Sequence, residues 1–158
     1  MKTSTIALAL SLLGTTMAAP SAESSKRQDT RYPYSLNGLW LRRLTEADRY
    51  AFLTYVGRYD SSGEILSSTT CQTSWNPEAP AGPENPVACA DPAFSFFFPN
   101  GIQNLENYEI TVNGPDGQAR GEIVAGPKYA CGPYEGMIEG IEYECRITDG
   151  GAFFLPLV

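Results

Sequence analysis

The chain has 158 residues, with 18 acidic and 11 basic side chains, a formal net charge of −7 at pH 7 and no histidine. An acidic surface repels phosphate backbones and anionic lipid headgroups, so neither a nucleic acid nor a membrane surface is an expected partner. The absence of histidine excludes the Ser-His-Asp and Cys-His catalytic systems and every histidine-ligated metal site.

The N-terminal segment is typical of a secretory signal peptide. Lys2 precedes an apolar run over residues 6–13, and small residues follow up to Ala18 and Ala19. We expect a signal peptide over residues 1–18, with cleavage after Ala19 as the alternative, and hence a secreted, extracellular product. The apolar run is shorter than the roughly 20 residues that a bilayer-spanning helix needs, so no membrane anchor is expected.

Residues 19–27 form a Ser-containing stretch that ends in the dibasic pair Lys26-Arg27. The pair resembles the site cut by fungal dibasic-processing proteases, which predicts a short pro-segment over residues 19–27; otherwise it is a solvated pair of charges. With 27 of the 158 residues removed, the mature chain would begin at Gln28 and keep 131 residues. That length predicts a single domain over residues 28–158.

The periodicity of the mature chain is that of β-strands. Aromatic and β-branched residues gather in short runs, and Gly, Asn, Asp and Pro lie between them. The expected strands cover residues 39–41, 51–58, 64–71, 94–98, 108–112, 118–125, 141–147 and 152–158. Short strands at this spacing predict an all-β fold, either a small antiparallel β-barrel or a sandwich.

Two segments depart from the strand pattern. Residues 45–48 start with a capping-like Thr and predict at most one helical turn. Residues 75–92 contain five prolines, which predicts a long loop because proline interrupts both strands and helices. Trp75 stands at the head of this loop and is a possible partner contact if it is exposed; packing against a disulfide is the alternative.

Aromatic residues at two places in the chain are candidates for the core. Alternation predicts that Phe94, Phe96 and Phe98 point to the buried face of one strand, with Phe97 on the opposite face. Trp40 lies inside an apolar run and is also expected in the core.

All four cysteines lie in the region expected to be exported to an oxidising compartment: Cys71, Cys89, Cys131 and Cys145. We therefore expect two disulfides, for which three pairings are possible. Pairing of sequence neighbours would close two compact loops, each stabilising the fold by about 3 kcal/mol in the chain-entropy model. The chain has no CxxC pair, so neither a zinc site nor another cofactor is expected.

Paired carboxylates are the remaining route to catalysis. Glu142 and Glu144 would share one face of a strand about 7 Å apart, a pattern that can serve glycoside hydrolysis. The same alternation is typical of a half-exposed strand with Tyr143 and Cys145 pointing inward. We expect this second case, in which Glu142 and Glu144 lie on a wet strand face without a catalytic role.

Arg42, Arg43 and Arg49 form the only local basic cluster. We expect it to pair with the acidic surface of the protein, and recognition of a carboxylate partner is the alternative.

Cysteine spacing and strand order together resemble the Alternaria major-allergen family of secreted fungal proteins, which includes elicitors of hypersensitive-type defence responses in plants. The resemblance spans about Leu39 to Leu157. The features that carry it are, in chain order, Trp40, the cysteines Cys71 and Cys89, the aromatic strand over residues 94–98, the strand that contains Tyr108, and the cysteines Cys131 and Cys145 before an apolar C-terminal strand.

The resemblance implies a compact antiparallel β-barrel with disulfides Cys71–Cys89 and Cys131–Cys145, and no enzymatic apparatus. It further implies a virulence-related effector, elicitor or allergen-like protein that binds a host extracellular protein or receptor. The alternative is a small secreted carbohydrate-active hydrolase that uses paired carboxylates. Some members of the family are joined into dimers by an extra cysteine; residues 28–70 contain none, so we expect a monomer or a non-covalent dimer.

Overall fold

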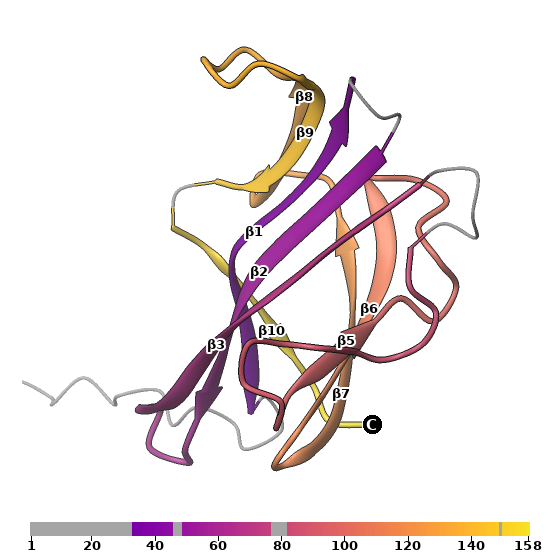
Figure 1. The fold of residues 1–158 in the computed structure, drawn as a ribbon. Coiled ribbons are helices and arrows are strands. Elements are labelled where there is room, and N and C mark those ends of the chain that lie inside the picture. Colours follow the sequence, from indigo (N-terminus) through magenta and orange to yellow (C-terminus); the bar gives the residue numbers. More distant parts are fainter. Residues whose placement is uncertain (1–32, 46–48, 77–81, 149) are drawn as a thin grey trace, which may run out of the picture.

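The computed structural model describes residues 33–45, 49–76, 82–148 and 150–158. These ranges contain ten β-strands and no helix (Figure 1), which confirms the expected all-β fold. The strands are β1 (Tyr34–Leu44), β2 (Arg49–Tyr59), β3 (Ile65–Trp75), β4 (Val87–Ala88), β5 (Ser95–Phe97), β6 (Asn107–Gly114), β7 (Gly117–Val124), β8 (Tyr129–Pro133), β9 (Ile141–Ile147) and β10 (Ala152–Leu155). The expected signal peptide, the expected pro-segment and residues 46–48 of the expected helical turn lie outside the described residues.

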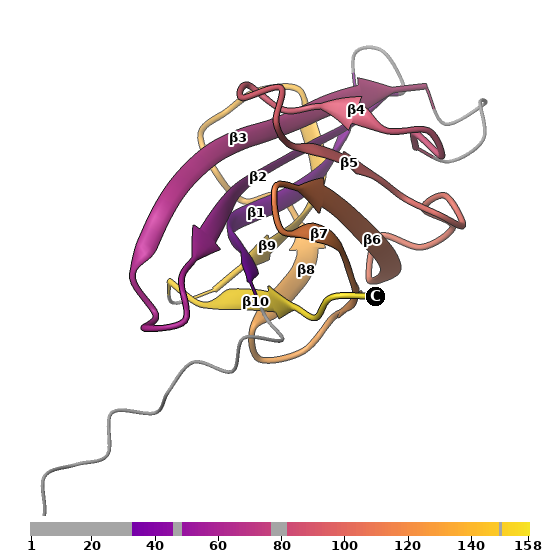
Figure 2. The same cartoon turned by 90° about the horizontal axis from the view of Figure 1, so that it is seen from below.

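The strands form two antiparallel sheets that face each other as a sandwich (Figure 2). The first sheet has the order β3-β2-β1-β9-β8, with β10 also paired to β1, and the second has the order β4-β5-β6-β7. After β10 the chain reaches the second sheet, where the amide of Arg120 in β7 donates to the carbonyl of Pro156. The sheets do not close into a barrel, so the sandwich is the correct alternative and the barrel implied by the resemblance is wrong.

Strand β1 serves both halves of the first sheet because its register shifts next to Gly38. Residues 34–37 pair with β10 and residues 40–44 pair with β9. Gly38 has a φ of +54°, and a Cβ at this position would lie 2.9 Å from Cδ2 of Tyr55. Only glycine suits that conformation and that space, and the irregularity brings the second half of β1 alongside β9.

Alternation along β1 decides which side chains enter the core. Leu39 and Leu41 are 1% and 0% exposed, whereas Trp40 between them is half-buried on the outer face of the sheet. The expectation of a core Trp40 is therefore wrong, because a period of two cannot bury three consecutive residues on one face.

The aromatic strand follows the expected alternation. Phe94, Phe96 and Phe98 are fully buried, and Phe97 is half-buried on the other face of β5. Phe52 from the first sheet packs between the layers, with its ring centre 5.2 Å from that of Phe96 and 5.1 Å from that of Phe98. These rings join the two sheets.

Both expected disulfides are confirmed, and they indicate an oxidising environment. Cys71–Cys89 links β3 to the residue that follows β4 and so joins an edge of each sheet. Cys131–Cys145 links directly opposite residues of β8 and β9. The proline-rich segment is described at residues 75–76 and 82–92, where β4 is an addition to the expected loop.

No membrane-spanning helix is found in the part of the chain that the structure describes.

Candidate functional site

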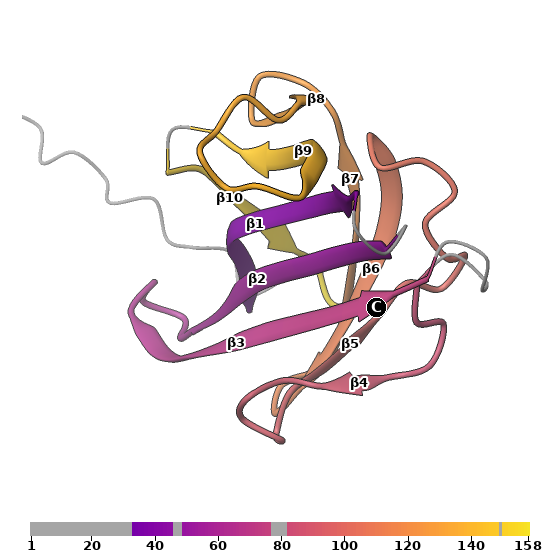
Figure 3. The ribbon, with the colours of Figure 1, turned by 45° about the horizontal axis from the view of Figure 1, so that its top comes forward.

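The outer face of the first sheet carries a row of charged and aromatic side chains. Arg42 of β1 lies opposite Glu144 of β9, and Trp40 lies opposite Arg146 two register positions away. Opposite residues of an antiparallel pair project to the same face, so these four side chains lie together over the sheet. Figure 3 shows the strand order that produces this row, with the β8–β9 hairpin at one edge.

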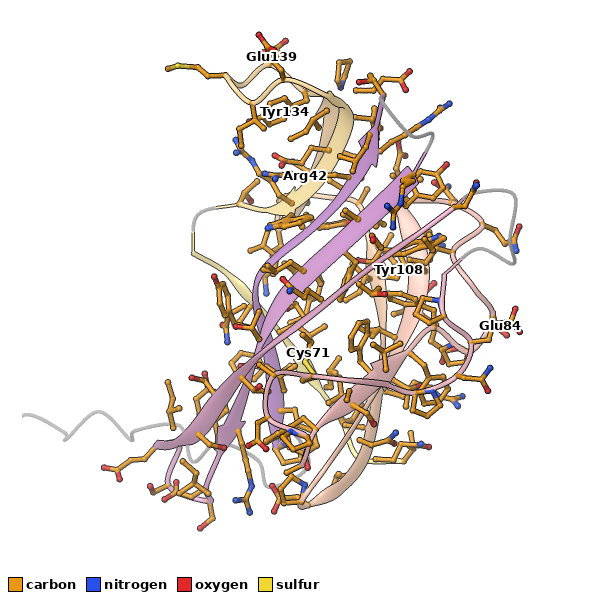
Figure 4. The ribbon with its side chains drawn as sticks, viewed as in Figure 1. Arg42, Cys71, Glu84, Tyr108, Tyr134 and Glu139 are labelled. Atoms are coloured by element: carbon orange, nitrogen blue, oxygen red, sulfur yellow. A yellow bond between two sulfur atoms is a disulfide. The ribbon has the colours of Figure 1, made fainter. Side chains whose placement is uncertain are left out.

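Arg42 is held by three neighbours. Its Nε donates a hydrogen bond of 2.5 Å to Oε2 of Glu144. Its guanidinium carbon lies 4.3 Å from the ring centre of Trp40 and 5.7 Å from that of Tyr134, within the range of a cation–π contact. Figure 4 shows Arg42 and Tyr134 on the same side of the hairpin. The guanidinium therefore fixes the positions of a carboxylate and two rings.

Glu144 is the buried member of this group. Its side chain is 6% exposed, and its Oε1 lies 3.6 Å from Nη1 of Arg146. The expectation that Glu144 belongs to a wet strand face is wrong, because contacts from β1 cover it. Glu142 is 53% exposed as expected, and its Oε2 lies 3.3 Å from Nε of Arg43. Each of the two carboxylates thus has an arginine as its counter-ion.

The expected pairing with acidic side chains is confirmed for two of the three arginines of the basic cluster. Arg42 and Arg43 bind Glu144 and Glu142. Arg49 instead donates from Nη2 to Oγ of Ser74 at 2.8 Å.

A depression of about 370 Å³ opens over the outer face of β8 and β9. Gly132 and Glu144 lie opposite each other in the strand register and both line it. Tyr134, Glu135 and Arg146 also line it, which gives one aromatic ring and groups of both charges. The depression is thus polar, with a buried carboxylate in its lining.

The loop that joins β8 to β9 exposes two apolar side chains. Met137 is fully exposed and Ile138 is 55% exposed. Figure 1 shows this end of the hairpin standing clear of the two sheets, and the Cys131–Cys145 disulfide crosslinks the strands behind it. We call residues 134–140 the hairpin tip.

A second depression, of about 430 Å³, lies on the second sheet. Glu109 of β6 and Glu122 of β7 are opposite each other in the register and both line it, together with amide side chains that include Asn100. Nδ2 of Asn100 donates to Oε2 of Glu109 at 3.0 Å, and Nε of Arg120 lies 3.5 Å from Oε1.

Trp75 is buried, with 9% of its surface exposed. Its ring centre lies 5.8 Å from that of Tyr50 and 5.9 Å from that of Phe98. The expectation of an exposed Trp75 that contacts a partner is therefore wrong. Trp75 ends β3, the edge of the first sheet opposite to β8, so the structure does not bring it together with the hairpin.

Sequence reasoning missed the hairpin tip, Gly132 and the Glu109/Glu122 pair. The tip had a signal, since Met137-Ile138 is an apolar pair between Gly136 and Gly140 in an acidic segment. Glu109 and Glu122 become neighbours only through the pairing of β6 with β7. Gly132 comes to line the depression beside Glu144 only through the pairing of β8 with β9.

Among the described residues, no group of three or more Asp, Glu, Cys or His side chains is placed to hold a metal ion. No family model, curated protein or solved structure matches the chain.

Proposed function

We propose that this is a secreted fungal effector, elicitor or allergen-like protein that acts outside the cell by binding a host protein, without catalysis. The observation that carries the proposal is the pair of exposed apolar side chains at the hairpin tip, Met137 and Ile138. The leader-like N-terminal sequence and the two disulfides support export to an oxidising compartment.

The hairpin tip has the properties of a docking element. Exposed apolar side chains gain free energy when a partner removes them from water, by about 25 cal/mol per Å² of apolar surface. The Cys131–Cys145 crosslink and the pairing with β9 restrain the strands that carry the tip. A restrained loop loses less conformational entropy on binding than a free one, which favours affinity.

Charge defines the kind of partner that the tip fits. Residues 129–145 contain four glutamates and no lysine or arginine, and Glu135 and Glu139 flank the two apolar side chains. The complementary surface is a basic protein surface around an apolar socket that receives Met137 and Ile138. Such a partner agrees with the net charge of −7.

The arginine pairing of Glu142 and Glu144 supports binding over catalysis at the hairpin. A general acid or base must meet the reacting group of its substrate, and the Glu144 side chain is instead buried and bonded to Arg42. The 2.5 Å bond from Arg42 to Glu144 places that carboxylate in the role of a structural counter-ion.

The test compares two double variants in leaf infiltration. Met137→Ser with Ile138→Ser removes the apolar tip, and Ile65→Ser with Leu66→Ser is the matched control, because those side chains are also 64% and 52% exposed but lie on β3. We expect the tip variant to need more than about tenfold more protein for the same ion leakage, whereas the control equals the native protein. Equal potency of the tip variant and the native protein would overturn the proposal.

The second candidate function is a carbohydrate-active hydrolase, and the Glu109/Glu122 pair favours it because two carboxylates face each other across β6 and β7 in a depression. The test is the release of reducing sugar from plant cell-wall polysaccharide by the native protein and by Glu109→Gln with Glu122→Gln. Release that the double variant loses would establish the hydrolase. No release, together with an unchanged leaf response of the variant, would exclude this pair as a catalytic site.

A further inference from the structure

We propose that the depression over β8 and β9 is a binding site for a short neutral saccharide. Residues 134–136 of the hairpin tip line it, but the apolar contacts Met137 and Ile138 do not. Its lining combines an open glycine, a buried carboxylate, side chains of both charges and an aromatic ring.

Gly132 keeps the depression open, and nothing in its surroundings demands a glycine. It is not among the described glycines with positive φ, and a Cβ built on it would meet no atom within 4 Å. Glycine weakens a strand relative to residues with a side chain, so its presence in β8 costs stability. Since Gly132 lies opposite Glu144, the missing side chain leaves room for a ligand beside the carboxylate.

Glu144 offers a hydrogen-bond acceptor to a ligand in the depression. Its side chain is more than nine-tenths buried, and Oε2 receives the hydrogen bond from Arg42. Oε1 lies 3.6 Å from Arg146, which is an ion-pair distance and too long for a hydrogen bond. A carboxylate has about four acceptor positions, and the hydrogen bond from Arg42 occupies only one of them, on Oε2. Ligand hydroxyls can therefore donate to Oε1.

The balance of charges selects an uncharged ligand. Glu144 is compensated by Arg42, and Glu135 and Arg146 contribute one charge of each sign to the lining. A cationic or anionic ligand would meet as much repulsion as attraction, whereas hydroxyl groups donate to carboxylates and accept from guanidinium groups.

Tyr134 supplies an apolar surface to this polar site. Its ring lines the depression and packs over Gly136, where an added Cβ would overlap the tyrosine hydroxyl. The contact with the Arg42 guanidinium restrains the ring from the sheet side. A pocket of about 370 Å³ with one ring and a few placed polar groups has the size and character of a small-ligand site.

The test is a titration of the ¹⁵N-labelled full-length mature protein followed by amide chemical shifts. The neutral probes are cellobiose, xylobiose and N,N′-diacetylchitobiose; the charged probes are digalacturonate and the chitosan dimer. We expect saturable shifts at Gly132 and Arg146 with at least one neutral probe at millimolar concentration, and none with the charged probes. No saturable shift with any neutral probe, or binding of charged probes alone, would overturn the proposal.

Variants locate the site. Gly132→Val fills the depression and should raise the dissociation constant by about tenfold or more. Gly126→Val is the matched control, because Gly126 also has nothing within 4 Å of its virtual Cβ but does not line the depression, and it should bind as the native protein does. Arg146→Gln, at a side chain 67% exposed, should weaken binding without unfolding the protein, which keeps the test valid if Gly132→Val misfolds. Native affinity in Gly132→Val and Arg146→Gln would overturn the assignment.

The Met137→Ser, Ile138→Ser variant separates this inference from the proposed function. It should keep the saccharide shifts of the native protein while losing the leaf response. Loss of the saccharide shifts in that variant would overturn the separation of the two sites.

Discussion

At the scale of single residues, the Arg42–Glu144 pair shows how a surface sheet face can bury a charge. The two residues are 102 positions apart, and the pairing of β1 with β9 brings them into contact. The pair is intermediate between a surface salt bridge and a core ion pair, since the side chains are 20% and 6% exposed. Loss of Arg42 should cost folding free energy, because the Glu144 carboxylate then remains buried without this partner.

Removal of Arg42 should therefore destabilise the fold more than removal of Arg43. Arg42→Met is expected to lower the free energy of unfolding by about 2–3 kcal/mol, because Glu144 loses its hydrogen-bonded counter-ion and keeps only the longer contact with Arg146. Arg43→Met is the control, since Arg43 and Glu142 are both about half exposed and such pairs contribute about 0–1 kcal/mol. Urea denaturation measures both. Equal losses in the two variants would show that burial of Glu144 is not what makes the pair important.

Trp75 is a core residue and should behave as one. Trp75→Ala is expected to cost about 3 kcal/mol of folding free energy, because the indole packs between Tyr50 and Phe98. Trp75→Phe retains an aromatic ring there and should cost less. Thermal or urea unfolding of the two variants checks this. If Trp75→Ala kept native stability but lost the leaf response, the residue would be a partner contact after all.

At the scale of elements, the hairpin depends on its disulfide. Replacement of Cys131 and Cys145 by Ala is expected to cost about 3 kcal/mol in the chain-entropy model, a value close to that for Cys71 and Cys89 because the sequence separations are 14 and 18. The local effects should differ. Amide hydrogen exchange should speed up chiefly in β8, β9 and the tip in the first variant, and at β3 and β4 in the second. Faster exchange spread equally over both sheets in the two variants would contradict a locally acting hairpin disulfide.

Strands with an alternating pattern could be predicted from the sequence, and strands formed by long-range pairing could not. Residues 141–147 were predicted at the observed bounds of β9 because apolar and charged residues alternate there. Strand β8 was missed because Gly132 and Pro133 are poor strand residues, and only pairing with β9 and the disulfide make it a strand. The burial of Glu144 was missed for a similar reason: periodicity gives the face of a side chain and not what covers it.

At the scale of the whole molecule, Arg58 and Asp116 join the two sheets on the side away from the hairpin. Nε and Nη2 of Arg58 in β2 each donate to a carboxylate oxygen of Asp116, in the β6–β7 turn, at 2.6 Å. The Arg58 hydrogen bonds hold the pKa of Asp116 below its ordinary value. The hydroxyl of Tyr34 accepts from the amide of Asp116 at 2.8 Å and ties β1 to the same turn.

This contact should make the association of the sheets sensitive to acid. A carboxyl whose pKa is lower in the folded state stabilises the fold above its unfolded pKa, about 3.9, and loses that contribution as the pH falls through the lower folded value. The stability difference between the native protein and Asp116→Asn should therefore be largest near neutral pH and shrink below about pH 4. Urea midpoints at a series of pH values measure it. A difference that stays constant down to strongly acidic pH would contradict this role.

The account rests most heavily on the claim that the folded surface acts by binding. The most direct measurement is ion leakage from leaf tissue infiltrated with equal amounts of native protein and of protein whose two disulfides have been reduced and alkylated, with circular dichroism to establish the fold of each sample. We predict a dose-dependent response to the native protein and little response to the unfolded one, because the tip loses its support when Cys131–Cys145 is opened. Equal responses to both samples would contradict the account and indicate recognition of a linear peptide instead.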